Sequence, residues 1–211
     1  MSIAREGLPY ILIPAAISIV LLALGYWYGV IYWYAAIPFA LVTAFMAYFF
    51  RDPWREPPQD QTAVVAPADG KVTRVGTIAD TPDAPTIVSI FLSPLDVHIN
   101  RAPIAGTVTN VSYTRGKFLM ATDKNASLVN EQNALTIQGE KITVVCKQIA
   151  GILARRIICW KHAGEHVSLG ERFGLIKFSS RTDVLLPAGV KVLVTEGMRV
   201  RGGITIIGRI Q

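Results

Sequence analysis

The residues best suited to chemistry form a polar interruption between two apolar runs near the C-terminus. Ser179, Ser180, Arg181, Thr182 and Asp183 separate two expected strands, residues 173–178 and 183–186. A serine hydroxyl becomes a nucleophile when a neighbouring base takes its proton, and a carboxylate commonly orients that base. Upstream, the chain carries a candidate base and a candidate orienting carboxylate, His98 and Asp69.

Each of these residues also has an ordinary structural explanation. Serine and aspartate are frequent in turns, so residues 179–183 are equally typical of a surface hairpin turn. Asp69 precedes a glycine, as turn aspartates often do, and His98 is compatible with a satisfied structural histidine. The two other histidines, His162 and His166, stand in no comparable motif and are expected on the surface.

Taken together, three phrases resemble the signatures of phosphatidylserine decarboxylase proenzymes in their short, pyruvoyl-dependent form. The phrases are Pro67-Ala68-Asp69-Gly70, Ser93-Pro94-Leu95-Asp96-Val97-His98-Ile99-Asn100-Arg101-Ala102-Pro103 and Ser180-Arg181-Thr182-Asp183. The resemblance extends over nearly the whole chain. A fourth phrase, residues 130–133, is similar to the family's Asn-Glu-Arg-Asn, although a helix terminus explains it equally well.

The resemblance implies self-cleavage between Ser179 and Ser180, which would give chains 1–179 and 180–211. Ser180 would become a covalent pyruvoyl group, the enzyme's own cofactor, with His98 and Asp69 as further catalytic residues. The pyruvoyl group would form a Schiff base with the amine of phosphatidylserine and accept the electron pair left by CO2, giving phosphatidylethanolamine. The competing hypothesis is a non-enzymatic, membrane-anchored adaptor of lipoyl-like β structure.

Two positions depart from the family pattern. Arg101 stands where long-form members carry a second histidine. Ser179 stands where the family usually has glycine, which tolerates strained backbone and close approach. The sequence leaves three explanations open for Ser179: slowed or blocked processing, a natural and accommodated change, or an engineered change that traps the proenzyme.

Arg101 and Arg115 are the candidates for holding the substrate phosphate, because cations pair well with it. Lys117 is a weaker candidate, and a solvated basic face is the alternative for all three. No metal is expected, because one histidine in a motif falls short of the three or four ligands of a zinc site.

The N-terminal segment, residues 1–50, is expected to be a transmembrane hairpin. The 44 residues from Gly7 to Phe50 carry no charge. As helix they would measure about 66 Å, enough for two passes with a turn near residues 25–29. A single tilted helix is the alternative; a cleaved signal peptide fits poorly, because the uncharged run is too long. Arg5, Arg51 and Arg55 would lie on the cytoplasmic side of the inner membrane, with the catalytic domain.

The rest of the chain is expected to be mostly β (α+β). A Pro-rich linker, residues 51–62, precedes a compact antiparallel catalytic domain, residues 63–211, with barrel-sandwich or lipoyl-like character. Two phrases, residues 66–72 and 102–108, share the pattern Ala-Pro-x-x-Gly-x-Val, and each should enter a strand through a glycine turn. Gly116 to Gln132 is the expected helix.

Composition narrows the class of partner. The mean hydropathy of +0.39 indicates that part of the chain lies in lipid. Residues 62–211 carry 18 Lys+Arg against 11 Asp+Glu, a net charge of +7 that suits anionic phospholipids. No nucleic-acid motif is visible.

Cys146 and Cys159 lie in apolar runs and are expected to be free thiols. The sequence leaves the oligomeric state open, with a homodimer as one option.

Overall fold

The computed structural model describes residues 2–79, 81, 83–121, 123, 126–152, 156–178 and 180–211. The chain divides into two compact units, Met1–Trp54 and Arg55–Gln211. The boundary between the units falls inside the expected linker, residues 51–62. Each unit is described below by itself.

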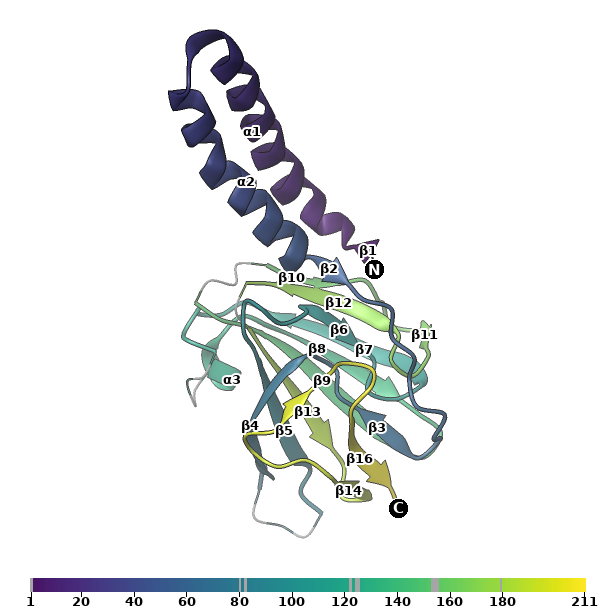
Figure 1. Cartoon of the computed structure of the whole chain (residues 1–211). Coiled ribbons are helices and arrows are strands. Elements are labelled where there is room, and N and C mark those ends of the chain that lie inside the picture. Colours follow the sequence, from purple (N-terminus) through teal and green to yellow (C-terminus); the bar gives the residue numbers. More distant parts are fainter. Residues whose placement is uncertain are drawn as a thin grey trace. The chain divides into compact units, whose positions relative to one another are not determined.

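The N-terminal unit is a helical hairpin. A short 3-10 helix, η1 (Arg5–Gly7), leads into α1 (Leu8–Tyr28), which is followed by the antiparallel neighbour α2 (Ile31–Phe49). Strand β1 (Ser2–Ile3) pairs with β2 (Arg51–Asp52), so the two ends of the hairpin meet (Figure 1).

Backbone conformation at Gly29 and close packing at Gly25 explain the two glycines near the turn. Gly29 joins the helices with a φ of 109°, a conformation that glycine adopts without penalty. Gly25 faces the indole of Trp33 so closely that a Cβ would collide with it. Midway along the hairpin, the Ser18 hydroxyl donates to the carbonyl of Ala36 at 3.2 Å. The observed turn thus lies at the end of the expected one.

Both helices are long and apolar enough to cross a membrane. Stretches of 18 residues within 5–28 and within 31–49 reach mean hydropathies of 2.3 and 1.5. Helix α1 has 21 residues and α2 has 19. These lengths correspond to about 31 and 28 Å, close to the ~30 Å hydrocarbon core of a bilayer.

The C-terminal unit is mostly β, as expected, and its main feature is a curled antiparallel sheet (Figure 1). Within the described residues the sheet has the strand order β11-β7-β8-β9-β13-β5-β4-β15. The bounds are β4 (Gly70–Thr77), β5 (Thr86–Leu92), β7 (Gly106–Thr114), β8 (Gln132–Gln138), β9 (Thr143–Ala150), β11 (His166–Val167), β13 (Ser180–Leu186) and β15 (Arg199–Val200).

Two smaller antiparallel sheets complete the described part of this unit. One has the order β10-β12-β6, with bounds β10 (Arg156–Cys159), β12 (Arg172–Lys177) and β6 (Ile99–Arg101). The other has the order β14-β16-β3, with bounds β14 (Val190–Val192), β16 (Ile206–Ile210) and β3 (Ala63–Val65).

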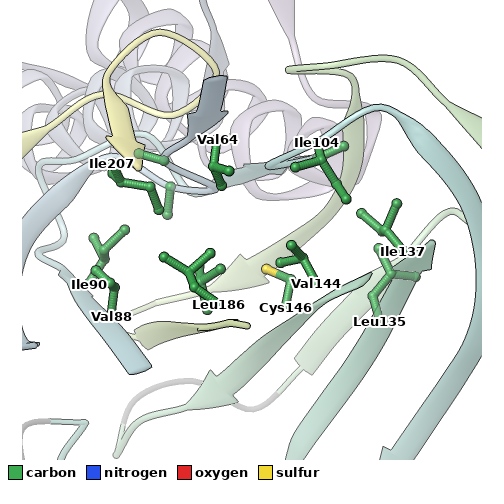
Figure 2. Close-up of a cluster of buried hydrophobic side chains, with 14 of the residues drawn as sticks. Val64, Val88, Ile90, Ile104, Leu135, Ile137, Val144, Cys146, Leu186 and Ile207 are labelled. Carbon is green, nitrogen blue, oxygen red and sulfur yellow. The ribbon is translucent and has the colours of Figure 1, made fainter. Parts of the chain in front are cut away.

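The hydrophobic core lies between the curled sheet and these smaller layers. Figure 2 shows side chains from β5, β13, β9 and β8 facing Val64 of β3 and Ile207 of β16. Val184 and Leu186 represent the inward row of β13, which alternates with outward residues because successive strand side chains point to opposite faces. Both cysteines are free thiols, as expected, with Cys146 in the core and Cys159 half-buried.

The curled sheet consists of two halves with the same internal order. The matching phrases at residues 66–72 and 102–108 lead into β4 and β7, as the sequence predicts. Each of these strands pairs with a two-residue edge strand, β15 or β11, and with the strand that follows it, β5 or β8. Strands β13 and β9 then meet at the centre.

The halves differ in one connection. In one half, β8 and β9 are joined by a tight turn, with the Gly139 N–H bonded to the Ile142 carbonyl. In the other half, the chain leaves β5 at Leu92 and returns to that half of the sheet only at Ser180, the Cα partner of Leu92 in the register. The intervening residues include the whole second half of the sheet. Ser180 therefore marks the point where the chain returns from a long insertion.

The structure corrects the expectation of a turn at residues 179–183. Strand β13 already begins at Ser180, and Ser180 to Asp183 are buried. Strands β12 and β13 belong to different sheets, so they form no hairpin. The polar side chains fit a buried strand because most of them have partners inside the protein, as described below.

The structure also contradicts the expected helix from Gly116 to Gln132. Only α3 (Ala126–Val129) is α-helical in the described part of this range, and β8 begins at Gln132. Long-range contacts overrule the local pattern. The Asn130 side chain bonds both the N–H and the carbonyl of Leu119, and Lys117 bridges to the backbone of Asn130.

Candidate functional site

Strand register brings the motif residues to one end of the curled sheet. Lys71, Phe91, Arg181 and Ile149 form a row across β4, β5, β13 and β9. One step further along, Ser180 is paired with Leu92 on one side and with Ala150 on the other. We call this edge the site end. Asp69 immediately precedes β4 and therefore lies at the site end too.

His98 reaches the same end from the smaller sheet. Asn100 lies opposite Gly174 in β12, and its side chain bonds that of Thr182 in β13. Gly174 and Thr182 therefore both lie beside Asn100, Gly174 before the β12–β13 connection and Thr182 after it. Two residues closer to this connection are Ile176, whose N–H donates to the His98 carbonyl, and Ser180. Measured from Asn100 and Thr182, the backbones of His98 and Ser180 therefore both lie toward the β12–β13 connection.

Ser180 is fully buried, and its Oγ has no hydrogen-bond partner among the described residues. A buried hydroxyl without a partner loses its interactions with water and gains nothing in return, so such groups are few in folded proteins and call for an explanation. Nearby, Phe178 has a φ of 62°, in the left-handed region that costs a non-glycine residue about 1–2 kcal/mol. Ser179, the other predicted cleavage-site residue, lies outside the described residues.

The imidazole of His98 is completely buried, and its Nδ1 lies 3.0 Å from the carbonyl oxygen of Asp96. Asp96 is itself held in place, because one carboxylate oxygen accepts from the Ser93 N–H at 2.9 Å and the other pairs with Arg199. The loop before His98 is thus locally fixed. A neutral imidazole whose Nδ1 carries the proton presents Nε2 as the basic atom.

The structure gives Asp69 partners of its own. Arg55 donates to one carboxylate oxygen at 2.8 Å, and the Gly202 N–H donates to the other at 2.8 Å. These contacts fix the loop between β3 and β4. The orientation of His98 by Asp69 stays a prediction.

A chain of buried amides links β6, which begins directly after His98, to β13, which begins at Ser180. Asn133 of β8 donates to the Oε1 of Gln148 at 3.1 Å, and Gln148 of β9 donates to the Oδ1 of Asn100 at 2.8 Å. Asn100 in turn donates to the Thr182 hydroxyl at 3.0 Å. All four side chains are buried. The chain of bonds ends two residues from His98 in one strand and two residues from Ser180 in the other.

The outward row of β13 holds a different cluster. Arg181 and Asp183 form an ion pair, with the Arg181 Nε 3.0 Å from the Asp183 Oδ1. Arg181 also donates to the carbonyls of Ala121 and Asp123, and the Ser127 hydroxyl donates to Asp183 at 3.0 Å. Burial raises the pKa of the Cys146 thiol well above its ordinary value, and the nearby Asp183 charge adds to this effect. This cluster fastens the segment containing α3 to the back of β13.

The two predicted phosphate ligands occupy different environments. Arg101 is buried and donates to the Gly170 carbonyl at 3.1 Å, a contact that favours a structural role. Arg115 is exposed and follows β7 directly after Thr114, whose partner Gln132 pairs with Ile149. Arg115 and the neighbouring, exposed Lys117 therefore lie toward the site end. His162 and His166 are exposed, as expected.

A cavity of about 530 Å³ lies away from this site. Its lining includes the linker residues Gln59 and Asp60, Ile104 before β7, and Lys141 in the turn between β8 and β9. That turn is at the opposite end of β9 from Ala150. The cavity therefore does not coincide with the site end, and the buried polar residues around Ser180 are the better guide to chemistry.

Sequence reasoning missed the amide chain and the strained Phe178. A signal for the amides was present, because Gln148 interrupts the inward row between Cys146 and Ala150. Asn100 and Asn133 also stand inside the motifs already singled out. Nothing in the sequence distinguishes Phe178 from an ordinary strand residue.

Comparison with known proteins identifies the family. A family model described as phosphatidylserine decarboxylase matches residues 42–208. A phosphatidylserine decarboxylase proenzyme of Solibacter usitatus is 51% identical over 174 residues, 82% of this chain and 83% of the relative. The relative of the same name from Geobacter sulfurreducens is 42% identical over 211 residues, 98% of this chain and 95% of the relative. The chain therefore belongs to the phosphatidylserine decarboxylase family, a family of decarboxylases processed from proenzymes.

Proposed function

We propose that this chain converts phosphatidylserine to phosphatidylethanolamine and CO2 with a pyruvoyl group made from its own Ser180. The observation that carries the proposal is the buried Ser180 hydroxyl, which has no hydrogen-bond partner within the described residues and begins a central strand. A hydroxyl that is consumed during maturation needs no permanent partner. The environment of Ser180 therefore fits a serine that is converted to a pyruvoyl group.

Maturation would begin with attack of the Ser180 Oγ on the carbonyl carbon of residue 179. The amide becomes an ester, and removal of the Ser180 α-proton then breaks the Cβ–Oγ bond. Chain 1–179 leaves as a carboxylate. Water hydrolyses the remaining dehydroalanine to the pyruvoyl group and ammonia. The positive φ of Phe178 supports this site, because backbone strain beside a scissile bond is relieved by cleavage.

The small chain would stay in place after cleavage. Strand β13 lies between β5 and β9, with Ser180 to Leu185 paired on both sides. Its inward residues Val184 and Leu186 are in the core. Cutting the chain before Ser180 therefore leaves the sheet and its core contacts intact.

His98 would act as the base that accepts the Ser180 proton, and later as the proton donor to the substrate α-carbon. Two features support both roles: hydrogen bonds of Asp96 fix the loop before His98, and His98 lies at the site end together with Ser180. Asp69 would orient His98 from the loop between β3 and β4. Once formed, the pyruvoyl carbonyl supplies the electron sink that decarboxylation of an amino acid requires.

The substrate places the reaction at a membrane surface. Phospholipid acyl chains leave a bilayer only at high cost, because each buried CH2 is worth about 0.8 kcal/mol. Helices α1 and α2 would anchor the chain in the inner membrane, with the catalytic unit on the cytoplasmic side. Arg115 is the better-situated candidate for the substrate phosphate, because it is exposed, whereas Arg101 is buried.

Replacement of His98 tests the proposal. The wild-type chain should separate into fragments 1–179 and 180–211 under denaturing conditions, and should release CO2 from phosphatidylserine. His98→Ala should stay a single chain and release none. His162→Ala is the matched control, since His162 is exposed and pairs with Glu165, and it should mature normally. Normal cleavage of the His98→Ala chain would remove His98 from the maturation step, and an uncleaved wild-type chain would contradict the proposed function itself.

A further inference from the structure

The site end of the C-terminal unit carries a group of exposed apolar side chains. Leu128 is 79% exposed, Leu95 62%, Met120 61% and Ile152 57%. Phe118 and Val129 are also exposed. We call these six residues the apolar rim. Exposed apolar residues scattered singly need no explanation, but a group on neighbouring segments does.

Each segment of the rim is attached to β13 or to one of its two neighbours in the sheet, β5 and β9. Leu95 lies in the loop that follows Leu92, one Cα partner of Ser180, and Ile152 follows Ala150, the other partner. The Asn130 amide bonds the carbonyls of Leu119 and Ala150, which ties the segment of Phe118 and Met120 to the same strand.

Leu128 and Val129 are tied to the back of β13. Their neighbour Ser127 bonds Asp183 at 3.0 Å, and Arg181 holds the carbonyls of Ala121 and Asp123. The buried ion pair thus fixes a segment whose apolar side chains point away from the core. Holding apolar side chains in water is unfavourable, so this surface is expected to contact another molecule.

The charges beside the rim indicate what that partner is. Arg115, Lys117 and Arg156 are exposed on the same or adjoining segments. The combination of apolar side chains and neighbouring cations is the pattern by which proteins enter the head-group layer of an anionic membrane.

We propose that the apolar rim inserts into the head-group region of an anionic phospholipid bilayer and brings the site end to its substrate there. This inference rests on the proposed function for the identity of the substrate. Insertion lets the head group reach Ser180 while the acyl chains remain in the lipid. The rim is a contact of the C-terminal unit itself, separate from anchoring by α1 and α2.

Depth-dependent fluorescence quenching tests the contact without relying on activity. Leu128→Cys in the full chain is labelled with bimane and reconstituted in vesicles of phosphatidylglycerol and brominated phosphatidylcholine. Ile78→Cys is the matched control, because Ile78 is 49% exposed and follows β4 at the Thr77–Thr86 end, opposite the site end. The labels should be quenched at position 128 and not at position 78.

Equal quenching at both positions, or none at either, would overturn the proposal. Shielding of the position-128 label that depends on protein concentration in detergent, without quenching by lipid, would assign the rim to contact between two copies and also overturn it.

Kinetics separate this proposal from the proposed function. Met120→Gln/Leu128→Gln should lose about tenfold of its activity on phosphatidylserine in vesicles, because weaker insertion removes access to the substrate. The same variant should keep wild-type activity on a water-soluble, short-chain phosphatidylserine, and should self-cleave normally. The control Ile78→Gln/Leu193→Gln should match the wild type throughout.

Wild-type activity of Met120→Gln/Leu128→Gln on vesicles would contradict insertion. If the wild type decarboxylates neither substrate, the proposed function fails, and the quenching experiment still decides whether the rim enters lipid.

Discussion

At the scale of single residues, Ser180 is distinguished by complete burial, by an Oγ without a hydrogen-bond partner among the described residues and by its place at the start of β13. The adjacent Ser179 offers a second hydroxyl. A shift of one residue along a strand sends the side chain to the opposite face. The Ser180 side chain shares its face with Thr182, whose hydroxyl bonds Asn100 two residues beyond His98.

The mass of the small fragment should therefore correspond to residues 180–211, a blocked chain of 32 residues. Ser180→Ala should remain a single chain of 211 residues. A 33-residue fragment beginning at position 179 would overturn the assignment of the nucleophile.

We also expect Ser179→Gly to mature at least as fast as the present sequence. Removal of the Cβ gives the backbone more freedom at the attacked carbonyl. The half-time of cleavage after synthesis measures the effect, with Ser168→Gly as a control at a distant serine. Slower maturation of the glycine variant would show that Ser179 assists the reaction.

The two thiols provide a prediction that depends on pH. Burial raises the pKa of Cys146 well above 9.0 and raises that of the half-buried Cys159. Because the thiolate is the reactive form, iodoacetamide at pH 8 should modify both far more slowly in the native protein than in urea. Cys159 should react before Cys146.

The same shift affects stability. The Cys146 thiol ionises near pH 9 in the unfolded chain but only at a higher pH in the folded protein. Its contribution to the free energy of unfolding is therefore fully present below pH 9 and declines as the pH rises further. Cys146→Ala should therefore lose less thermal stability than the wild type between pH 9 and pH 10.5. Parallel losses in both proteins would contradict the assigned shift.

At the scale of elements, the amide chain from Asn133 to Thr182 joins the strands that carry the candidate catalytic residues. Gln148 is its centre, bonded to Asn133, Asn100 and the Ile158 carbonyl. A buried polar network has a definite geometry when every member has a partner, and is costly when one is removed.

Gln148→Met keeps the length of the side chain and removes its amide. Buried groups on Asn100 and Asn133 then lose partners, at about 1–3 kcal/mol each. Thermal unfolding in a Ser180→Ala background, in which all chains stay uncut, should show this loss. Self-cleavage of Gln148→Met with Ser180 restored should also be slower, because Asn100, which bonds Thr182, loses the bond that ties it to β9.

Gln138→Met is the matched control for this variant, since Gln138 is exposed at the far end of β8. Its stability and cleavage should be those of the wild type. If Gln148→Met also behaves as the wild type, the amide chain does not position the site.

At the scale of the whole molecule, the chain combines a hairpin of apolar helices with a β unit whose curled sheet has two similar halves. The pairing of Ser2 with Asp52 brings the ends of the hairpin together. If α1 and α2 each cross the membrane, both ends must lie on one side, and the turn at Gly29 and Val30 on the other.

Cysteine labelling in intact cells should therefore give the same result at Ser2→Cys and Gln59→Cys. A membrane-impermeant maleimide added outside the inner membrane should modify neither. Val30→Cys, at the exposed turn, should be labelled and acts as the control. Opposite results at positions 2 and 59 would rule out the two-pass hairpin.

The family, the class of fold and the position of the motifs could be predicted from the amino-acid sequence, because these depend on local patterns. Uncharged length indicated the helical hairpin, short apolar runs indicated the β unit, and paired Ala-Pro-x-x-Gly-x-Val phrases marked two equivalent strands. The same local reasoning assigned a turn to residues 179–183 and a helix to residues 116–132, and both assignments were wrong.

Those two segments and the assembly of the site could not be predicted in this way, because the contacts that define them join residues far apart in the chain. Ser180 becomes a strand residue through its pairing with Leu92 and Ala150, across an insertion of most of the β unit. Asn130 and Arg181 hold residues 117–123 by bonds that no helical pattern contains. Strand register is set by these non-local hydrogen bonds and by which face is buried, and neither can be read from one segment alone.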